Sequence, residues 1–545
     1  MCSSDLAYTL TAKVIDIAGN ASAASGSFTT TVDTTAPTVS SVAITSATGI
    51  QNSTLNAGDV VSVTVSMSEA VTVTGTPQVG LNVGGTTVYA NYASGSGTSS
   101  LVFTYTIQAG QTDANGISIA ANSLGLNGGT IADAAGNVAT LAHAAVADNA
   151  GYLVDTTAPT SLASVSLTLD AASDSGVSSS DEITSTTTPT VTTSTLNGIA
   201  MSVNDVIQVV DTTNANAVVG TYVVVAGDLT GGVWSGTTKS ITLSALAGGD
   251  HALAVRLSDA AGNVGSAGVT NTITIDAAGP TLASAYPAAA GTGVATNTSI
   301  ILTFSENIYA NGGTVTIQAG TVNTFVMTLG AGTSTGSFST GAGSWTIAGN
   351  KLIIDPSGSF ANSTTYNVDI AGTALKDVAG NAYAGVTSTN TANLYFATGT
   401  TADTTAPGTQ VSTLAFSSDT GSSSSDFNTK TAAQTVSGTL NGNLAAGETV
   451  QVSLDNGATW KYADTSTVGS NTFSLSGVTL TGSNTLQARV LDAAGNAGTV
   501  RSQAYIYDTT APNAPSITSV TDDVGSITGT LTSGGRTDDT NLTVR

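Results

Sequence analysis

The stretch Asp16-Ile17-Ala18-Gly19-Asn20, followed by Asp33-Thr34-Thr35-Ala36-Pro37, organises the chain. The first part has the form Asp-x-Ala-Gly-Asn, the second reads Asp-Thr-Thr-Ala-Pro, and a short run of small and β-branched residues separates them. The pair returns at 133–137 with 155–159, at 259–263 with the variant Asp276-Ala277-Ala278-Gly279-Pro280, at 377–381 with 403–407, and at 492–496 with 508–512. Five copies of a two-part motif indicate that the chain is built from repeats.

The spacing of the motif gives the size of each repeat. The closing aspartates stand at 33, 155, 276, 403 and 508, which are steps of 122, 121, 127 and 105 residues. Repeats of this length are separate domains of about the size of an Ig domain, and 545 residues exceed what one core can organise. We predict the end of a domain at 1–36, whole domains at 37–158, 159–279, 280–406 and 407–511, and the start of a further domain at 512–545.

The two ends of the chain enter and leave the repeats part-way. Residues 1–6 do not match the repeat pattern, and we interpret them as a foreign leader or a sequencing artefact. We therefore expect the chain to be a fragment of a longer protein.

Apolar and polar residues alternate along short segments. Val61, Val63, Val65 and Met67 alternate with serine and threonine, and residues 101–107 show the same period of two, which is typical of half-buried strands. Helical period is absent, and turn residues separate the segments. The predicted fold class is all-β, with tandem Ig-like antiparallel β-sandwiches in an elongated array. We expect the tryptophans to fill domain cores, at Trp234, Trp345 and Trp460.

The charge of the chain limits its partners. It has 11 Lys and Arg against 35 Asp and Glu, a net charge of −24. Nucleic acid binding needs clustered basic residues, so this class of partner is excluded, and an anionic membrane surface is disfavoured. No apolar run approaches the length of a membrane span, so no membrane insertion is expected. The single cysteine, Cys2, permits no intrachain disulfide. Divalent cations are the natural counter-charge for the net charge of −24.

Motifs for catalysis are missing from the sequence. His143 and His251 are the only histidines, and they lie in different predicted domains. The chain has no Gly-x-Ser-x-Gly elbow, phosphate loop or His-Glu-x-x-His motif. We predict that this segment is not an enzyme.

Two motif sets support a resemblance to a known family. Residues 280–400 carry Phe304-Ser305-Glu306 and a Lys-Asp-x-Ala-Gly-Asn sequence that ends at Asn381, while 160–276 and 408–508 carry Ser-Asp-Ser/Thr-Gly followed by Ser-Asp. With these motifs, residues 7–545 resemble the tandem bacterial Ig-like domains of large surface adhesins and biofilm-associated (RTX-type) proteins. The resemblance implies an extracellular, elongated and non-catalytic array, secreted or held at the bacterial cell surface and often stiffened by calcium.

Sandwich topology predicts where the two halves of the motif meet. In a seven-stranded Ig sandwich, Asp-x-Ala-Gly-Asn precedes the last strand and lies at the end where the first strand begins. The other half follows the last strand and leads to the next domain. Each linker aspartate should therefore lie beside the loop of the following domain, which pairs Asp33 with Asp133, Asp155 with Asp259, Asp276 with Asp377, and Asp403 with Asp492.

Further acidic residues should join these pairs. Glu69 and Glu306 each end a second strand, so we expect them to complete the clusters Asp33–Glu69–Asp133 and Asp276–Glu306–Asp377. At the opposite end of two domains, acids spaced by seven residues should lie beside the outgoing linkers Asp276 and Asp508, at Asp174 and Asp181 and at Asp419 and Asp426. Grouped carboxylates suit Ca²⁺, which takes six to eight oxygen ligands, so we predict structural Ca²⁺ at the joints.

A simpler interpretation stays open for the same residues. The aspartates cap turns through hydrogen bonds to the backbone, and Asp-Thr-Thr-Ala-Pro serves only as a stiff linker.

The expected function is a stalk segment of a bacterial adhesin that projects a binding domain. Its partners would be the neighbouring repeats of the same chain, with any host or biofilm surface contacted through other domains. The alternatives are accessory modules of a secreted multidomain enzyme and glycan-binding modules.

Overall fold

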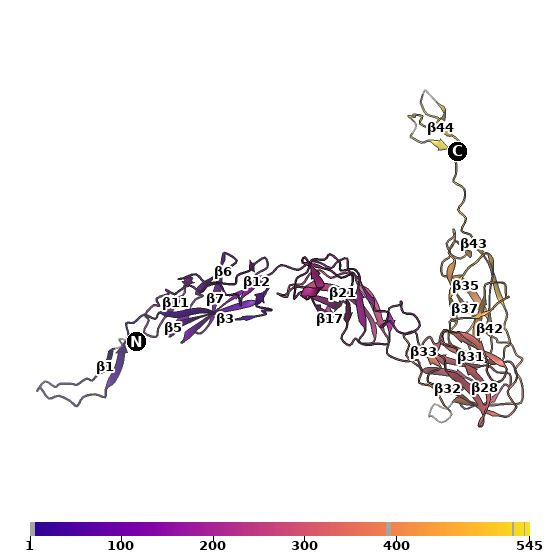
Figure 1. Cartoon of the computed structure of the whole chain (residues 1–545), viewed down its shortest axis with the longest axis horizontal. Coiled ribbons are helices and arrows are strands. Elements are labelled where there is room, and N and C mark those ends of the chain that lie inside the picture. The colour runs from indigo at the N-terminus through magenta and orange to yellow at the C-terminus, as the bar shows by residue number, and fades with distance from the viewer. Residues whose placement is uncertain (1–5, 388–393, 526–527, 539) are drawn as a thin grey trace. The chain divides into compact units, whose positions relative to one another are not determined.

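The computed structural model describes residues 6–387, 394–525, 528–538 and 540–545. In these ranges the regular structure is β-strand, apart from one short 3-10 helix, η1 (Ala226–Asp228). In Figure 1 the strands gather into separate bundles, each continuous in colour and so in sequence. The chain divides into two units, Met1–Ala278 with Ala379–Asn381, and Gly279–Val378 with Ala382–Arg545.

The first unit starts with an antiparallel hairpin and a domain of two sheets. The hairpin pairs β1 (Leu6–Leu10) with β2 (Phe28–Val32). The larger sheet of the domain contains β3 (Val39–Thr48), β5 (Val60–Thr74), β6 (Gln78–Val83), β7 (Thr86–Ser94), β8 (Thr98–Thr106), β10 (Leu124–Gly125) and β11 (Thr130–Ala132). The smaller sheet contains β4 (Thr54–Leu55), β9 (Thr112–Asp113) and β12 (Leu153–Asp155).

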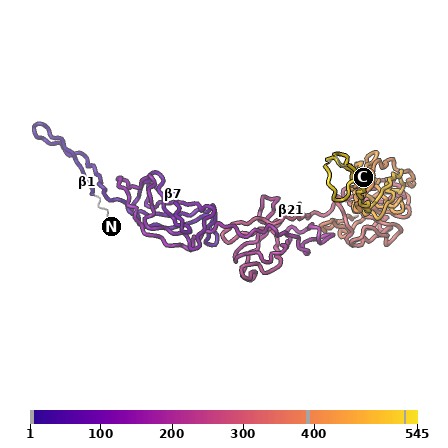
Figure 2. The backbone as a smooth tube through the Cα atoms, turned by 90° about the horizontal axis from the view of Figure 1, so that it is seen from above, coloured from indigo at the N-terminus to yellow at the C-terminus, as the bar shows by residue number. Residues whose placement is uncertain are grey.

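The second domain of this unit also has two main sheets. Figure 2 labels β21 in this domain and β7 in the domain before it. One sheet contains β13 (Leu167–Leu169), β15 (Thr190–Thr193) and β20 (Ser240–Thr242). The other contains β14 (Ile183–Thr184), β16 (Val206–Asp211), β17 (Ala217–Val223), β21 (Gly249–Ser258) and β22 (Asn271–Ile275), and a small hairpin joins β18 (Leu229–Thr230) to β19 (Val233–Trp234).

The second unit opens with a domain of two five-stranded sheets. One sheet contains β23 (Leu282–Tyr286), β25 (Ile300–Phe304), β29 (Thr335–Ser337), β30 (Gly343–Ala348) and β31 (Lys351–Pro356). The other contains β24 (Gly291–Val294), β27 (Thr314–Ala319), β28 (Val322–Thr328), β32 (Thr365–Ile370) and β34 (Leu394–Thr398), and a separate pair joins β26 (Tyr309–Ala310) to β33 (Leu375–Lys376).

The fourth domain repeats the arrangement with four and five strands. One sheet contains β35 (Val411–Phe416), β37 (Ala433–Leu440), β40 (Thr465–Ser466) and β41 (Thr472–Thr479). The other contains β36 (Asn428–Thr429), β38 (Thr449–Ser453), β39 (Lys461–Tyr462), β42 (Asn484–Leu491) and β43 (Arg501–Tyr507). Three strands follow it, β44 (Val520–Asp522), β45 (Gly529–Leu531) and β46 (Thr543–Val544).

Each of the four complete domains has its own apolar core, which confirms the all-β sandwich class. On β5 the alternating valines Val61, Val63 and Val65 are fully buried, as the period of two predicts. The turn at Gly84-Gly85 joins β6 to β7 through the pair Val83 and Thr86.

Two sequence expectations needed correction. The sheets are not purely antiparallel, because β12, β22, β34 and β43 each pair in parallel with a short strand of their own domain. Trp234 and Trp345 are buried, but Trp460 is only half-buried, and the guanidinium of Arg489 lies 4.0 Å from its ring centroid. A cation–π contact at the surface therefore replaces the expected core position.

Among the residues with described structure, no helix is long and apolar enough to cross a membrane.

Candidate functional site: the interdomain joints

The Asp-x-Ala-Gly-Asn loop is closed by its own first and last residues. In the first domain, Asp133 Oδ1 accepts hydrogen bonds from the backbone N–H groups of Ala135 and Asn137, at 2.9 and 2.8 Å. Asp133 Oδ2 accepts one from Asn137 Nδ2, at 2.8 Å. Gly136 has a φ of +95°, a conformation that favours glycine. The motif thus specifies one tight loop, and the simpler interpretation of its aspartate as a turn cap holds here.

The same bonds close three other loops. The carboxylates of Asp16, Asp259 and Asp492 each accept two backbone N–H groups and the side-chain amide of the asparagine four residues later. A recurrent loop of fixed geometry thus presents the same groups in four copies of the motif.

The asparagine of the loop also binds the linker from the preceding domain. Asn137 Nδ2 donates to the carbonyl oxygen of Asp33 at 3.1 Å, and Asn263 Nδ2 donates to that of Asp155 at 2.9 Å. The corresponding bonds run from Asn381 to Asp276 at 2.7 Å and from Asn496 to Asp403 at 3.2 Å. The linker and the following loop therefore meet as sandwich topology predicts.

The bridging role of the asparagine was missed by the sequence analysis. Asparagine is a common turn residue, and that role alone accounts for its place after the glycine. The signal that could have found it is its return at the same position in five copies of the motif, including the copy at Asn20.

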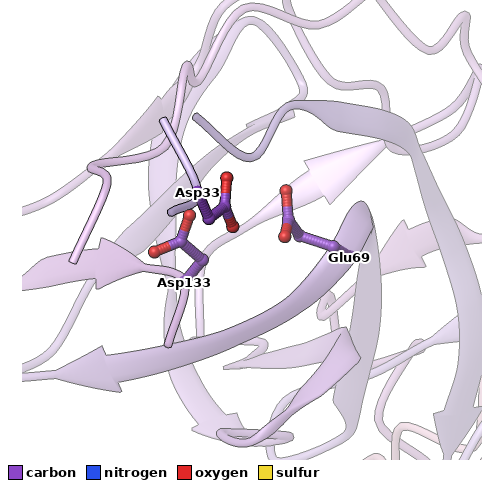
Figure 3. A group of neighbouring side chains, drawn as sticks. All are labelled: Asp33, Glu69 and Asp133. Atoms are coloured by element: carbon purple, nitrogen blue, oxygen red, sulfur yellow. The ribbon is translucent and has the colours of Figure 1, made fainter. Parts of the chain in front are cut away.

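Asp33, Glu69 and Asp133 form a compact acidic cluster at the first of these joints. One carboxylate oxygen of each lies within 4.8 Å of the others, and Figure 3 shows the three side chains pointing toward one another. Asp33 comes from the linker, Glu69 from β5, and Asp133 from the loop after β11. Asp133 is buried, and the other two are half-buried. The predicted grouping of these three residues is present.

Hydrogen bonds hold Asp133 in its ionised form. Burial by itself raises the pKa of Asp133, but the side-chain amide and backbone N–H of Asn137 and the backbone of Ala135 and Gly136 outweigh it, so the net pKa is lowered. The loop thus presents a carboxylate rather than a carboxylic acid to its neighbours.

A different third acid stands at the next joint. Asp155 and Asp259 line a hollow of ≈ 390 Å³ together with Asp205, which sequence analysis did not select. Asp205 is buried, and its pKa is raised chiefly by that burial and further by the charge of Asp259, against a hydrogen bond from the backbone N–H of Ser202. In the described ranges these three acids are not within 4.8 Å of one another, so this joint is the more open of the two.

The fourth domain has the same elements in its own loops. Asp403 Oδ1 accepts from the backbone N–H of Thr405, and Asp492 closes the loop described above. Glu448 precedes β38 as Asp205 precedes β16, and its carboxylate accepts from the backbone N–H of Ala445 at 2.9 Å, three residues earlier, as that of Asp205 does from Ser202. The sequence carries a signal for this equivalence that the sequence analysis missed, because both acids directly precede strands of similar sequence, at 206–209 and 449–452.

The residues predicted for the remaining joint divide between the two units. Asp276 lies in the first unit, where its carboxylate accepts from the backbone N–H of Ala278 at 3.1 Å. Glu306 and Asp377 lie in the second unit with carboxylate oxygens within 4.8 Å of each other, and Asp377 is fully buried. Their grouping with Asp276 stays a prediction.

The acids at the opposite end of the second domain sit beside its outgoing linker. Asp174 Oδ2 accepts from the backbone N–H of Glu182 at 3.2 Å, and Asp181 Oδ1 accepts from that of Ile183 at 3.3 Å. The backbone N–H of Asp276 donates to Thr184, at the end of the same loop. Asp174 is buried with Oδ1 unpartnered, and burial first, then the charges of Asp181 and Glu182, raise its pKa.

The equivalent loop of the fourth domain has the same bonds. Asp419 Oδ2 accepts from the backbone N–H of Phe427 at 2.9 Å, and Asp426 Oδ1 accepts from that of Asn428 at 3.0 Å. Asp508, the outgoing linker aspartate, donates its backbone N–H to Thr429. Asp419 Oδ1 is also buried without a hydrogen-bond partner.

The first cluster has the chemistry and size that a hard divalent cation requires. Ca²⁺ binds oxygen ligands at 2.3–2.6 Å, so two ligands on opposite sides of one ion are about 5 Å apart. The oxygens of Asp33, Glu69 and Asp133, within 4.8 Å of one another, fit that limit. Without a counter-charge the three carboxylates would repel one another.

Comparisons with known proteins follow the domain pattern. Two family models, each described as a bacterial Ig-like domain, match the chain, one at residues 276–398 and the other at 161–277 and 404–509. Among curated proteins, none matches the sequence.

Several solved structures resemble the chain at low identity. A tetra-tandem repeat from the extending region of a large adhesion protein is 17% identical, covers 87% of this chain and 99% of its own, and has a TM-score of 0.16. The BSP domain of a biofilm associated protein is 9% identical with coverages of 87% and 97% and a TM-score of 0.18. The FN1–FN3 domains of chicken CNTN1 are 11% identical with coverages of 63% and 99% and a TM-score of 0.20.

Proposed function

The chain belongs to the proteins built from tandem bacterial Ig-like domains, and from this premise we propose that it is a non-catalytic stalk segment of a bacterial adhesin. The segment would hold a binding domain away from the cell surface and transmit tension through its joints. Ca²⁺ bound by the acidic joints stiffens it, and it acts outside the cell, secreted or at the cell surface.

The observation that carries the proposal is the position of the Asp33–Glu69–Asp133 cluster. Its three carboxylates come from a linker, a strand end and a loop, and the linker residue precedes the first strand of the domain. A cation bound to all three would tie the linker to the domain that follows. Because the linker backbone is already anchored through Asn137 and Asp33, the ion would add stiffness to a joint whose position is set.

The buried, unpartnered oxygens of Asp174 and Asp419 support cation binding at the other end of two domains. A buried carboxylate oxygen without a hydrogen bond is costly, and a bound cation would supply its missing partner. These two loops are beside the outgoing linkers, so we include Asp174, Asp181, Asp419 and Asp426 among the proposed ligands. The remaining proposed ligands are Asp155, Asp259, Asp276, Glu306, Asp377, Asp403, Asp492 and Asp508.

A calcium titration of the whole chain tests the proposal. We expect Ca²⁺ to raise the Tm of the first domain and to increase the maximum dimension in solution scattering, with EDTA reversing both. Glu69→Gln should abolish the gain in that domain. Asp148→Asn, which removes an exposed carboxylate from the same domain, is the matched control and should respond as the unmodified chain does.

Two results would overturn the proposal. One is a titration in which Ca²⁺ changes neither the Tm nor the maximum dimension. The other is a Glu69→Gln chain that responds to Ca²⁺ as fully as the control.

A further inference from the structure

The third and fourth domains share an apolar contact, in addition to their separate cores. Ile301 of β25, Ile353 of β31 and Ala493, in the loop after β42, are buried together, with Tyr286 and Tyr462 packed against them. The four large apolar cores each stay inside a single domain, so this small cluster differs from them in crossing a domain boundary.

The burial pattern of β31 shows that both faces of this strand are covered. Lys351, Leu352, Ile353 and Ile354 are all buried, at 3%, 0%, 3% and 0% exposure. Leu352 and Ile354 belong to the core of the third domain, whereas Ile353 belongs to the shared contact. A strand with solvent on one face would alternate between buried and exposed residues, so the fourth domain replaces solvent on the outer face.

Lys351 brings an amine into this contact without a carboxylate. Its Nζ donates to the carbonyl oxygen of Ser466 on β40, and to Ser466 Oγ at 2.6 Å. No carboxylate of the described residues lies within the 4.0 Å of an ion pair. A buried ammonium with neutral acceptors alone is unfavourable, and burial lowers the pKa of Lys351 to about 8.

Other contacts cross the same domain boundary. Ser299 N–H donates to the carbonyl oxygen of Ala493 at 2.6 Å, and Asn297 Nδ2 donates to that of Ala494 at 3.4 Å. Gly349, with a φ of +58°, lies against the backbone of Asp464, where an added Cβ would come within 2.3 Å of the carbonyl oxygen. Lys351 therefore has little freedom to reach solvent while the two domains are in contact.

We infer that the third and fourth domains act as one docked body, and that a proton on Lys351 loosens the docking. The docking surface is the outer face of β25 and β31, and its partner is the fourth domain of the same chain. Loss of the proton removes the uncompensated charge and leaves the amine with the two Ser466 acceptors.

The sign of the pH effect follows from which state holds the proton. An undocked lysine keeps its proton up to about pH 10.5, while the docked one releases it near 8. The penalty on docking is complete well below pH 8 and disappears as the pH rises toward 10.5. Between pH 7 and pH 9, proton linkage makes the docking equilibrium about tenfold more favourable.

Other titratable groups near the contact change little in this window. Aspartates titrate near pH 4 and tyrosines near pH 10, and burial raises the pKa values of Tyr286 and Tyr462 further. The titratable and charged groups around the contact are Asp355 on the same strand, Tyr286 and Tyr462, which pack against the apolar cluster, and Asp464, whose backbone lies against Gly349. Asp403 and Asp492 act through their charges on Tyr286, and Arg489 acts on Tyr462.

Amide hydrogen exchange at Ser299 tests the inference in the whole chain, in EDTA to keep calcium out. The protection factor, corrected for the intrinsic exchange rate, should rise about tenfold from pH 7 to pH 9. In Lys351→Met the protection should not change with pH. Lys430→Met, which removes an exposed lysine of the fourth domain, should keep the tenfold rise.

Protection of Leu352 in the core of the third domain shows that each variant is folded. The inference is overturned if protection at Ser299 in the unmodified chain does not change with pH. It is equally overturned if a folded Lys351→Met chain retains the rise.

Discussion

Two joints of this molecule hold their domains by different means. Between the first and second domains, Asn52 and Asn56 donate side-chain amide bonds to the carbonyls of Ala260 and Ala261, at 2.8 and 2.9 Å. Between the third and fourth, Ile301 and Ile353 are buried in a shared apolar cluster. The first contact is polar and lies beside a hollow lined by carboxylates, whereas the second buries apolar side chains beside its hydrogen bonds.

This difference determines whether a bound cation or a change of pH can alter the stability of each joint. Hydrogen bonds at an exposed joint compete with water, and each contributes only about 0.5–1.5 kcal/mol, so a polar joint is weak until a cation adds to it. Burial of apolar side chains does not depend on an ion. We therefore expect calcium to act on the first kind of joint and proton concentration, through Lys351, on the second.

The largest expected effect comes from a charge on the apolar contact. Ile353→Glu would place a charged, larger-headed side chain among apolar neighbours and should weaken the docking of the third and fourth domains by about 3 kcal/mol, even with Lys351 on the same face of β31. In calorimetry, the two domains should then unfold in separate transitions. Val322→Glu, at a position of the third domain that is 65% exposed, should leave the transitions unchanged. If Ile353→Glu also leaves them unchanged, the contact does not hold the two domains together.

The next effect concerns the loop that both kinds of joint share. Asp133→Ala removes the acceptor of two backbone N–H groups and of the Asn137 amide, and should lower the Tm of the first domain by about 5 °C at pH 7. The pKa of Asp133 is lowered in the folded state, so its contribution is present above pH 3.8 and is lost as the pH falls through the folded value. Thermal unfolding of both chains at a series of pH values from 7 downward measures this. A difference in Tm that does not shrink as the pH falls below 3.8 would contradict the assignment of the effect to the carboxylate.

The smallest effect belongs to the amide that bridges domain and linker. Asn263→Ala removes the bond to the carbonyl of Asp155. It should weaken the joint between the first and second domains by about 1 kcal/mol. Asn20→Ala makes the same change in a loop where the amide donates to Asp16 alone. Limited proteolysis at the linker 155–159 should become faster in the first variant only. Equal rates in the two variants would mean that the bridge does not hold the linker.

The sequence predicted the repeat and the strand period because both depend on spacing along the chain, and it predicted the meeting of linker and loop because the topology of the sandwich follows from the strand order. The pairing of Asp33 with Glu69 and Asp133 followed from topology alone and is present in the structure. Calcium at this cluster and at the other joints remains a proposal.

What the sequence could not supply depends on three-dimensional contacts. Asp205 joins the second joint from a loop outside the Asp-x-Ala-Gly-Asn motif, and its burial beside Asp259 is visible only in the folded chain. The burial of Lys351 beneath another domain is also absent from the sequence, since nothing around this residue shows what covers it. The parallel pairing of each last strand was equally hidden, because strand spacing does not reveal direction.

The most direct test compares distance distributions across both joints by pulsed electron paramagnetic resonance. With Cys2→Ser as background, one spin-label pair occupies exposed positions Ser94 and Val218, and the other occupies Val322 and Val468. At constant pH we predict that Ca²⁺ narrows the distribution of the first pair and leaves that of the second narrow and unchanged. A first pair that is insensitive to Ca²⁺, or a second pair that is broad until Ca²⁺ is added, would contradict this account of the two joints.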